Sequence, residues 1–91
     1  MDTRLGFVGI IIENRTQSAT GVNRILSEHG NIIVARTGIP HAKGNTNIIT
    51  LVVDTDTDTL GVLTGKLGAL PGVSVKSALA KLSTHHEEPH T

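Results

Sequence analysis

The sequence predicts a small α+β domain with the element order β-α-β-β-α-β, and three patterns point to it. Two nearly continuous apolar runs of strand length, residues 5–12 and 48–53, predict strands buried at the centre of a sheet. Each run is followed by a segment with apolar residues at helical spacing. A Pro-Gly turn at 71–72 then leads into an alternating strand. Two βαβ crossovers that share one sheet give a ferredoxin-like sandwich: an antiparallel four-stranded sheet with both helices on one face.

The first helix is expected between the first two strands. Thr16 or Ser18 is its candidate N-cap and Gly30 its C-terminal stop. Its buried face is formed by Ala19, Val22, Leu26 and His29. A second strand over 32–36, broken by polar residues, suits an edge of the sheet, and residues 39–46 contain Pro, Gly and Asn, as in an exposed hairpin connection.

The second helix is expected to begin near residues 56–58 and to end near Leu70, because Pro71 cannot continue it. Its buried stripe consists of Leu60, Leu63, Leu67 and Leu70. The last strand follows over 73–79, with Val73 and Val75 on one face and polar or small residues on the other. Its lysine at position 76 also suits a sheet edge.

Length and composition limit the class of protein. With 91 residues, we expect a single domain over residues 1–82 and a disordered tail over 83–91. The formal net charge of +0 disfavours direct binding of nucleic acid or of an anionic membrane. The chain has no cysteine, no signal-like N-terminus and no apolar run that spans a bilayer, so we expect a cytoplasmic protein. Its core must consist of aliphatic side chains, and self-association would add to its stability by burying more surface.

Three segments of the chain resemble the proposed regulators of the iron-only hydrogenase system. They are Gly-Ile-Ile-Ile-Glu-Asn-Arg at 9–15, Arg-Thr-Gly-Ile-Pro at 36–40 and Leu-Thr-Gly-Lys-Leu-Gly-Ala-Leu-Pro-Gly-Val-Ser-Val-Lys at 63–76. The resemblance covers about residues 5–81. It implies an ACT-like fold, similar to the ligand-binding domain of the nickel-responsive regulator, and a regulatory role. DNA binding, if the regulation is transcriptional, would belong to another chain.

A candidate ligand site follows from basic and polar residues of the loop after the first strand and of the second strand with its hairpin, because the ACT-like resemblance implies that these segments of neighbouring subunits frame a pocket. Asn14 and Arg15 precede a helix N-terminus, where backbone N–H groups favour an anion. Arg36 and His41 lie on the second strand and its hairpin. If the resemblance holds, these residues bind a small anionic or amino-acid-like effector. The competing interpretation is helix capping and a solvated edge strand.

Three glycines, Gly61, Gly65 and Gly68, lie on one face of the second helix, away from the leucine stripe. Each costs about 1 kcal/mol relative to alanine in a helix interior. Close approach of a second subunit or another protein would explain them, and simple tolerance by the packing is the alternative. We therefore treat these glycines as a candidate interface.

Metal and catalytic sites have weaker support. The five histidines are poorly spaced for a metal site, so we expect no metal or other cofactor. Asp54, Asp56 and Asp58 could together hold a divalent cation, but their position before a helix favours capping. No catalytic signature has a supporting context, so we expect no enzyme.

The sequence thus predicts a regulatory module that forms a dimer or tetramer and senses a small molecule or binds a protein partner. The alternative is a non-sensing interaction protein, such as an accessory factor for metalloenzyme assembly. A metal sensor is a third, weaker hypothesis.

Overall fold

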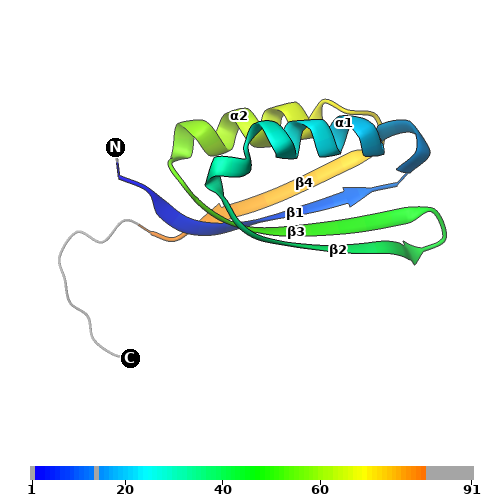
Figure 1. Ribbon diagram of the computed structural model, residues 1–91, viewed down its shortest axis with the longest axis horizontal. Helices are drawn as coiled ribbons and strands as arrows, with labels where there is room; N and C mark the ends of the chain where they lie inside the picture. Colours follow the sequence, from blue (N-terminus) through cyan, green and yellow to red (C-terminus); the bar gives the residue numbers. More distant parts are fainter. Residues whose placement is uncertain (1, 14, 82–91) are drawn as a thin grey trace.

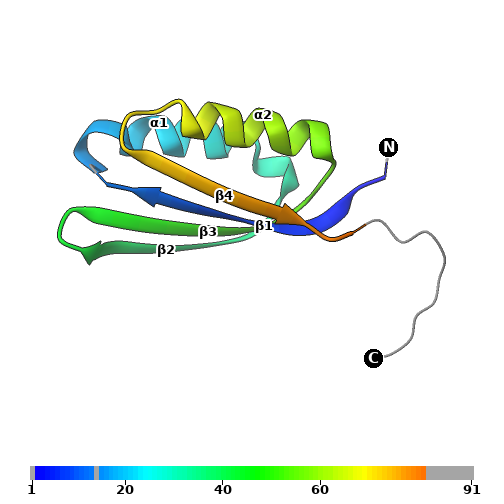
Figure 2. The ribbon, with the colours of Figure 1, turned by 180° about the vertical axis from the view of Figure 1, so that it is seen from behind.

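The computed structural model describes residues 2–13 and 15–81, without the side chains of residues 15 and 16. Two helices lie on one face of a four-stranded sheet, and the opposite face is left uncovered by the described elements (Figures 1 and 2). In chain order the elements are β1 (Arg4–Ile12), α1 (Arg15–Glu28), the 3₁₀ turn η1 (Gly30–Ile32), β2 (Ile33–Lys43), β3 (Thr46–Thr55), α2 (Thr57–Gly68) and β4 (Val73–Leu79).

The sheet order is β2-β3-β1-β4, and all three pairings are antiparallel. The predicted ferredoxin-like fold is confirmed, including the central position of the two most apolar strands. The expected tail over 83–91 lies outside the described residues. None of the described helices is long and apolar enough to cross a membrane.

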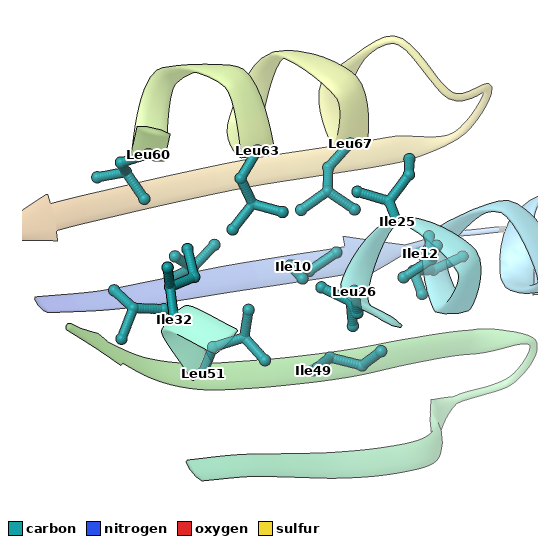
Figure 3. Close-up of a cluster of buried hydrophobic side chains, with 13 residues drawn as sticks. Ile10, Ile12, Ile25, Leu26, Ile32, Ile49, Leu51, Leu60, Leu63 and Leu67 are labelled. Carbon is teal, nitrogen blue, oxygen red and sulfur yellow. The ribbon is translucent and has the colours of Figure 1, made fainter. Parts of the chain in front are cut away.

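The hydrophobic core lies between the helices and the sheet (Figure 3). Alternate residues of the central strands point toward the helices and are buried: Val8, Ile10 and Ile12 in β1 and Ile49, Leu51 and Val53 in β3. The helices cover them with Val22, Ile25 and Leu26 from α1 and Leu60, Leu63 and Leu67 from α2. The leucine stripe of α2 therefore packs as predicted, and Leu70 packs against the edge of this core.

The start of α1 differs from the one expected, whereas its end lies just before Gly30 as predicted. The helix begins at Arg15, so neither Thr16 nor Ser18 is its N-cap. Ser18 is buried instead, and its hydroxyl donates a hydrogen bond to the carbonyl of Pro71. This bond joins α1 to the turn before β4, which explains a polar residue on an otherwise apolar face. The helix ends at Glu28, and Gly30 opens η1.

Helix α2 ends at Gly68, two residues before the expected end. Because Leu70 precedes a proline, the helical conformation is disfavoured there. The N–H of Leu70 donates to the carbonyl of Leu67 at 3.1 Å, which closes a tighter last turn. At the other end Asp56 is the N-cap, and its carboxylate accepts a hydrogen bond from the N–H of Thr59 at 2.7 Å.

The β2–β3 hairpin is longer than the sequence analysis predicts. β2 continues to Lys43, so residues 39–43 are strand and not loop, and only Gly44 and Asn45 remain in the turn. Pro40 is tolerated because β2 is an edge strand, where one side of the backbone needs no ladder partner. Gly44 has a φ of 59°, a conformation in which glycine carries little steric cost.

Candidate functional site

An open hollow of about 200 Å³ lies between α1 and the β2–β3 hairpin. It is on the helix-facing side of the sheet, beyond the part of the core that α1 covers. Its lining combines aliphatic side chains with three polar ones, and consists of Ile12, Ala19, Val22, Asn23, Arg36, Gly38, Ile39, Pro40, Asn47, Ile48 and Ile49. We refer to this set as the α1–β2 hollow.

Gly38 provides part of the space in the α1–β2 hollow. It pairs with Ile49, whose side chain is buried on the helix-facing side, so a side chain at position 38 would point the same way. A Cβ built on Gly38 would meet nothing within 4 Å. The hollow therefore exists partly because this position carries no side chain, while Ile12 and Val22 give it apolar walls.

A bulge in β2 places Arg36 at the hollow. Ile33 pairs with Val53 but Ala35 pairs with Val52, so Val34 is an extra residue and the alternation of side chains reverses after it. Arg36 therefore pairs with the buried Leu51 and shares its face.

The guanidinium of Arg36 is oriented by α1. Its Nη2 donates a hydrogen bond to Oδ1 of Asn23 at 2.7 Å. Both side chains are exposed, so the contact orients the arginine more than it stabilises the fold. A guanidinium has five N–H donors in a planar fork, which leaves donors of Arg36 available to a carboxylate or phosphate in the hollow.

His41 lies at the irregular end of the hairpin, and its place in a ligand site remains a prediction. It adopts a φ of 55°, which is uncommon for a non-glycine residue. Its N–H donates to Oδ1 of Asn47 at 2.9 Å, and its ring Nδ1 lies 3.2 Å from the carbonyl of Gly44. These contacts hold the irregular end of the hairpin, and His41 is not among the residues that line the hollow.

The ligand site predicted from the sequence remains a prediction. Asn14 and the side chain of Arg15 lie outside the described residues, although Arg15 begins α1. Of the four predicted residues, the structure places Arg36 at the hollow and leaves His41 in the hairpin. Asn23, Gly38 and Asn47 were missed. An asparagine one turn after Ala19 on the expected buried face was the available signal for Asn23.

The three glycines of α2 are all exposed, and a Cβ on any of them would meet nothing within 4 Å. Nothing among the described residues therefore requires glycine at these positions. Val62, on the same helix, is 52% exposed. The interface on this helix face remains a prediction.

Two of the three acidic residues, Asp56 and Asp58, act as the capping interpretation predicts, whereas Asp54 belongs to β3. Hydrogen bonds from the backbone and side chain of Thr59 lower the pKa of the Asp56 carboxyl below its ordinary value. Asp58 lies in the first turn of α2, where a negative charge suits the helix dipole. Over residues 2–13 and 15–81, no group of three His, Cys, Asp or Glu side chains is placed to hold a metal ion.

Comparisons with known proteins bear on the regulatory resemblance. A solved structure of an uncharacterized protein, TM1266 from Thermotoga maritima, is 39% identical, with a TM-score of 0.83 over 88% of this chain and 100% of that one. The ACT domain of a GTP pyrophosphokinase from Chlorobium tepidum is 23% identical, with a TM-score of 0.69 over 98% of this chain and 100% of that domain.

A nitrogen regulatory PII-like protein, CPII from Thiomonas intermedia K12, shares only the fold. It is 17% identical, with a TM-score of 0.50 over 86% of this chain and 91% of that one. No curated protein matches the chain.

A family model matches residues 4–77, which include both helices and nearly the whole sheet. Together with the Thermotoga relative, this match shows the family and confirms the resemblance seen in the sequence. The chain belongs to the TM1266-like family, the proposed regulators of the iron-only hydrogenase system.

Proposed function

We propose that the protein is a self-associating regulatory module that senses a small anionic or amino-acid-like ligand in the α1–β2 hollow. The observation that carries the proposal is Arg36, which Asn23 holds at 2.7 Å beside a hollow with apolar walls. A ligand with one carboxylate and a short aliphatic body matches both parts. Its carboxylate would accept hydrogen bonds from Arg36, and its body would contact Ile12 and Val22.

The size of the hollow limits the ligand. Its volume of about 200 Å³ lies below the roughly 300–1,000 Å³ typical of sites for drug-sized molecules, so a metabolite as small as an amino acid is favoured. The hollow is open, and Asn47 lies at its rim near the hairpin. A ligand there would contact α1 and both strands of the hairpin, and could bias their relative positions.

Two neighbours of the same fold support a sensing role by analogy. The CPII structure contains ADP, AMP and bicarbonate, and the Chlorobium domain belongs to a GTP pyrophosphokinase. Their identities of 17% and 23% transfer no residue and no ligand to this chain. They support only the general point that small regulatory domains of this shape bind small molecules.

The test is a titration of the ¹⁵N-labelled protein with the twenty common amino acids and with short-chain carboxylates, followed by NMR. We expect saturable shifts for at least one compound, centred on the residues of the α1–β2 hollow. Arg36→Gln should abolish them or weaken binding by on the order of tenfold or more, because a charged hydrogen-bond donor is lost. Arg24→Gln removes a charge from an exposed neighbouring position of α1 that does not line the hollow, and should bind as the wild type does.

Gly38→Val is the second variant. It fills the hollow with a side chain that suits a strand, so it should block binding without unfolding the protein. Shifts that persist unchanged in both Arg36→Gln and Gly38→Val would refute the site. A protein that binds none of the compounds would refute this ligand class.

The alternative function is docking to a protein partner without a small ligand, as in an accessory factor for metalloenzyme assembly. The exposed glycines of α2 favour it, because a helix face without side chains allows another backbone to come close. Loss of partner capture in Gly65→Ala, together with a hollow that binds nothing, would favour docking over sensing.

A further inference from the structure

The sheet face opposite the helices is apolar around its central strand β1, whereas β4 contributes Ser74 and Lys76 to the same face. The side chains of β1 that point away from the helices include Leu5, Phe7 and Ile11, which are 59%, 60% and 42% exposed, and Val52 of β3 is 43% exposed. Phe7 pairs with Val52 on one side and Ala78 on the other, so these side chains adjoin across three strands. We call this surface the open sheet face; it belongs to the side of the sheet that lies away from the helices in Figure 2.

Phe7 is the sole aromatic residue of the chain, yet it is absent from the core. An aromatic ring that is more than half exposed forfeits much of the free energy that its burial would contribute, about 1.5–3 kcal/mol. These four neighbouring side chains, Leu5, Phe7, Ile11 and Val52, are each at least 42% exposed. A partner that packs on this face would therefore bury a contiguous apolar surface.

The sequence of β1 also indicates that this face is covered. An antiparallel strand with one solvated face alternates apolar and polar residues, as β4 does with Val73 and Val75 inside and Ser74 and Lys76 outside. β1 reads Leu-Gly-Phe-Val-Gly-Ile-Ile-Ile over residues 5–12, with no polar residue on either face. That pattern is typical of a strand buried on both sides, and the helices of this chain bury only one.

A hollow on the open sheet face lies beside the exposed ring. It has a volume of about 390 Å³ and is lined by Leu5, Gly6, Phe7, Val52, Ala78, Leu79 and Ala80. Its lining is almost entirely apolar, and the alanines at positions 78 and 80 fill little of it. The same surface therefore presents a projecting ring and an adjacent apolar recess.

We propose that a second copy of this chain covers the open sheet face, with the Phe7 ring of each copy seated in the recess of the other. A projection and a recess on one surface are the requirement for a two-fold interface, in which the same patch occurs on both sides. Asp54 and Lys76 lie on this face by register and carry opposite charges, so two copies meet without net repulsion. A different protein would not account for the self-complementary shape.

This inference specifies the surface for the self-association contained in the proposed function, but it does not depend on ligand binding. The α1–β2 hollow is on the helix-facing side of the sheet. A variant that disrupts the open sheet face can therefore be tested for both properties separately.

The experiment is sedimentation of the wild type, Phe7→Glu and Thr20→Glu. Detection is by refractive index because the chain has no Trp or Tyr. We expect Phe7→Glu to reduce the assembly to half its mass or less, with a dissociation constant raised at least about 30-fold, as for a central interface anchor. Thr20 is exposed on α1 and lines neither hollow, so Thr20→Glu introduces the same charge away from the open sheet face and from the glycines of α2, and should leave the assembly unchanged.

A measurement on the wild type avoids any effect of the substitution on folding. In a mixture of ¹³C-labelled and unlabelled protein, we expect isotope-filtered NOEs between the Phe7 ring of one copy and the Ala78 methyl group of the other. A monomeric wild type, or an assembly that keeps its mass in Phe7→Glu and lacks these NOEs, would overturn the inference. A Phe7→Glu monomer that still binds a ligand at Arg36 would support both proposals. A wild type that shows the NOEs but binds none of the compounds would refute only the sensing proposal.

Discussion

Replacing the three exposed glycines of α2 by alanine should make the protein more stable. Gly61 and Gly65 lie within the helix and Gly68 at its last residue, and a Cβ at any of the three meets nothing within 4 Å. Two interior replacements at up to about 1 kcal/mol each, with a smaller gain at the helix end, give about 1.5–2.5 kcal/mol. Since 1 kcal/mol shifts Tm by roughly 4–8 °C in a domain of this size, the triple variant should melt roughly 6–20 °C higher.

The assay is thermal unfolding followed by far-ultraviolet circular dichroism. Gly21→Ala in α1 is the matched control, because its Cβ would lie 3.1 Å from a side-chain carbon of Leu70. This close contact should cancel most of the stability that alanine gains over glycine in a helix. A triple variant that is no more stable than the wild type would refute the reasoning. Sedimentation and partner capture measured on the same samples test the interface: higher stability with both unchanged would refute a contact on this helix face.

Two further predictions concern the strands and the cap of α2. Gly6→Ala should lower the free energy of unfolding in urea by about 1–3 kcal/mol, because the added Cβ would collide with the backbone of β4. Gly9→Ala has room for its Cβ and should change the free energy of unfolding by less than about 1 kcal/mol. Equal losses in the two variants would contradict this prediction. The lowered pKa of Asp56 means that its contribution to stability is present above the ordinary pKa of about 3.9 and is lost as pH falls through the folded value. Asp56→Asn keeps a side-chain oxygen that can accept the hydrogen bond from Thr59 but cannot be protonated in this pH range. Its Tm should therefore decline less steeply below about pH 4 than the Tm of the wild type. Parallel curves of Tm against pH for the two proteins would exclude this contribution of Asp56.

The fold could be predicted because its main determinants are local. Helical spacing placed the leucines of α2 on one face, and continuous apolar runs identified the two central strands. The end of α2 and the length of β2 were wrong, since they depend on the closing turn at Leu70 and on an edge position that tolerates Pro40. Such features are decided by neighbouring strands and turns, which periodicity does not describe.

The candidate site was less predictable because it depends on one extra residue in β2. With regular alternation from Ile33, whose partner Val53 is buried on the helix-facing side, Arg36 would point to the open sheet face. The bulge at Val34 reverses the alternation and brings Arg36 to the same side as Asn23 on α1. The sequence shows the arginine but not the bulge, so it could nominate the residue without identifying its partner. The bulge thereby leaves the open sheet face without this charge, so one irregularity in β2 supports both the proposed ligand site and the proposed contact between copies.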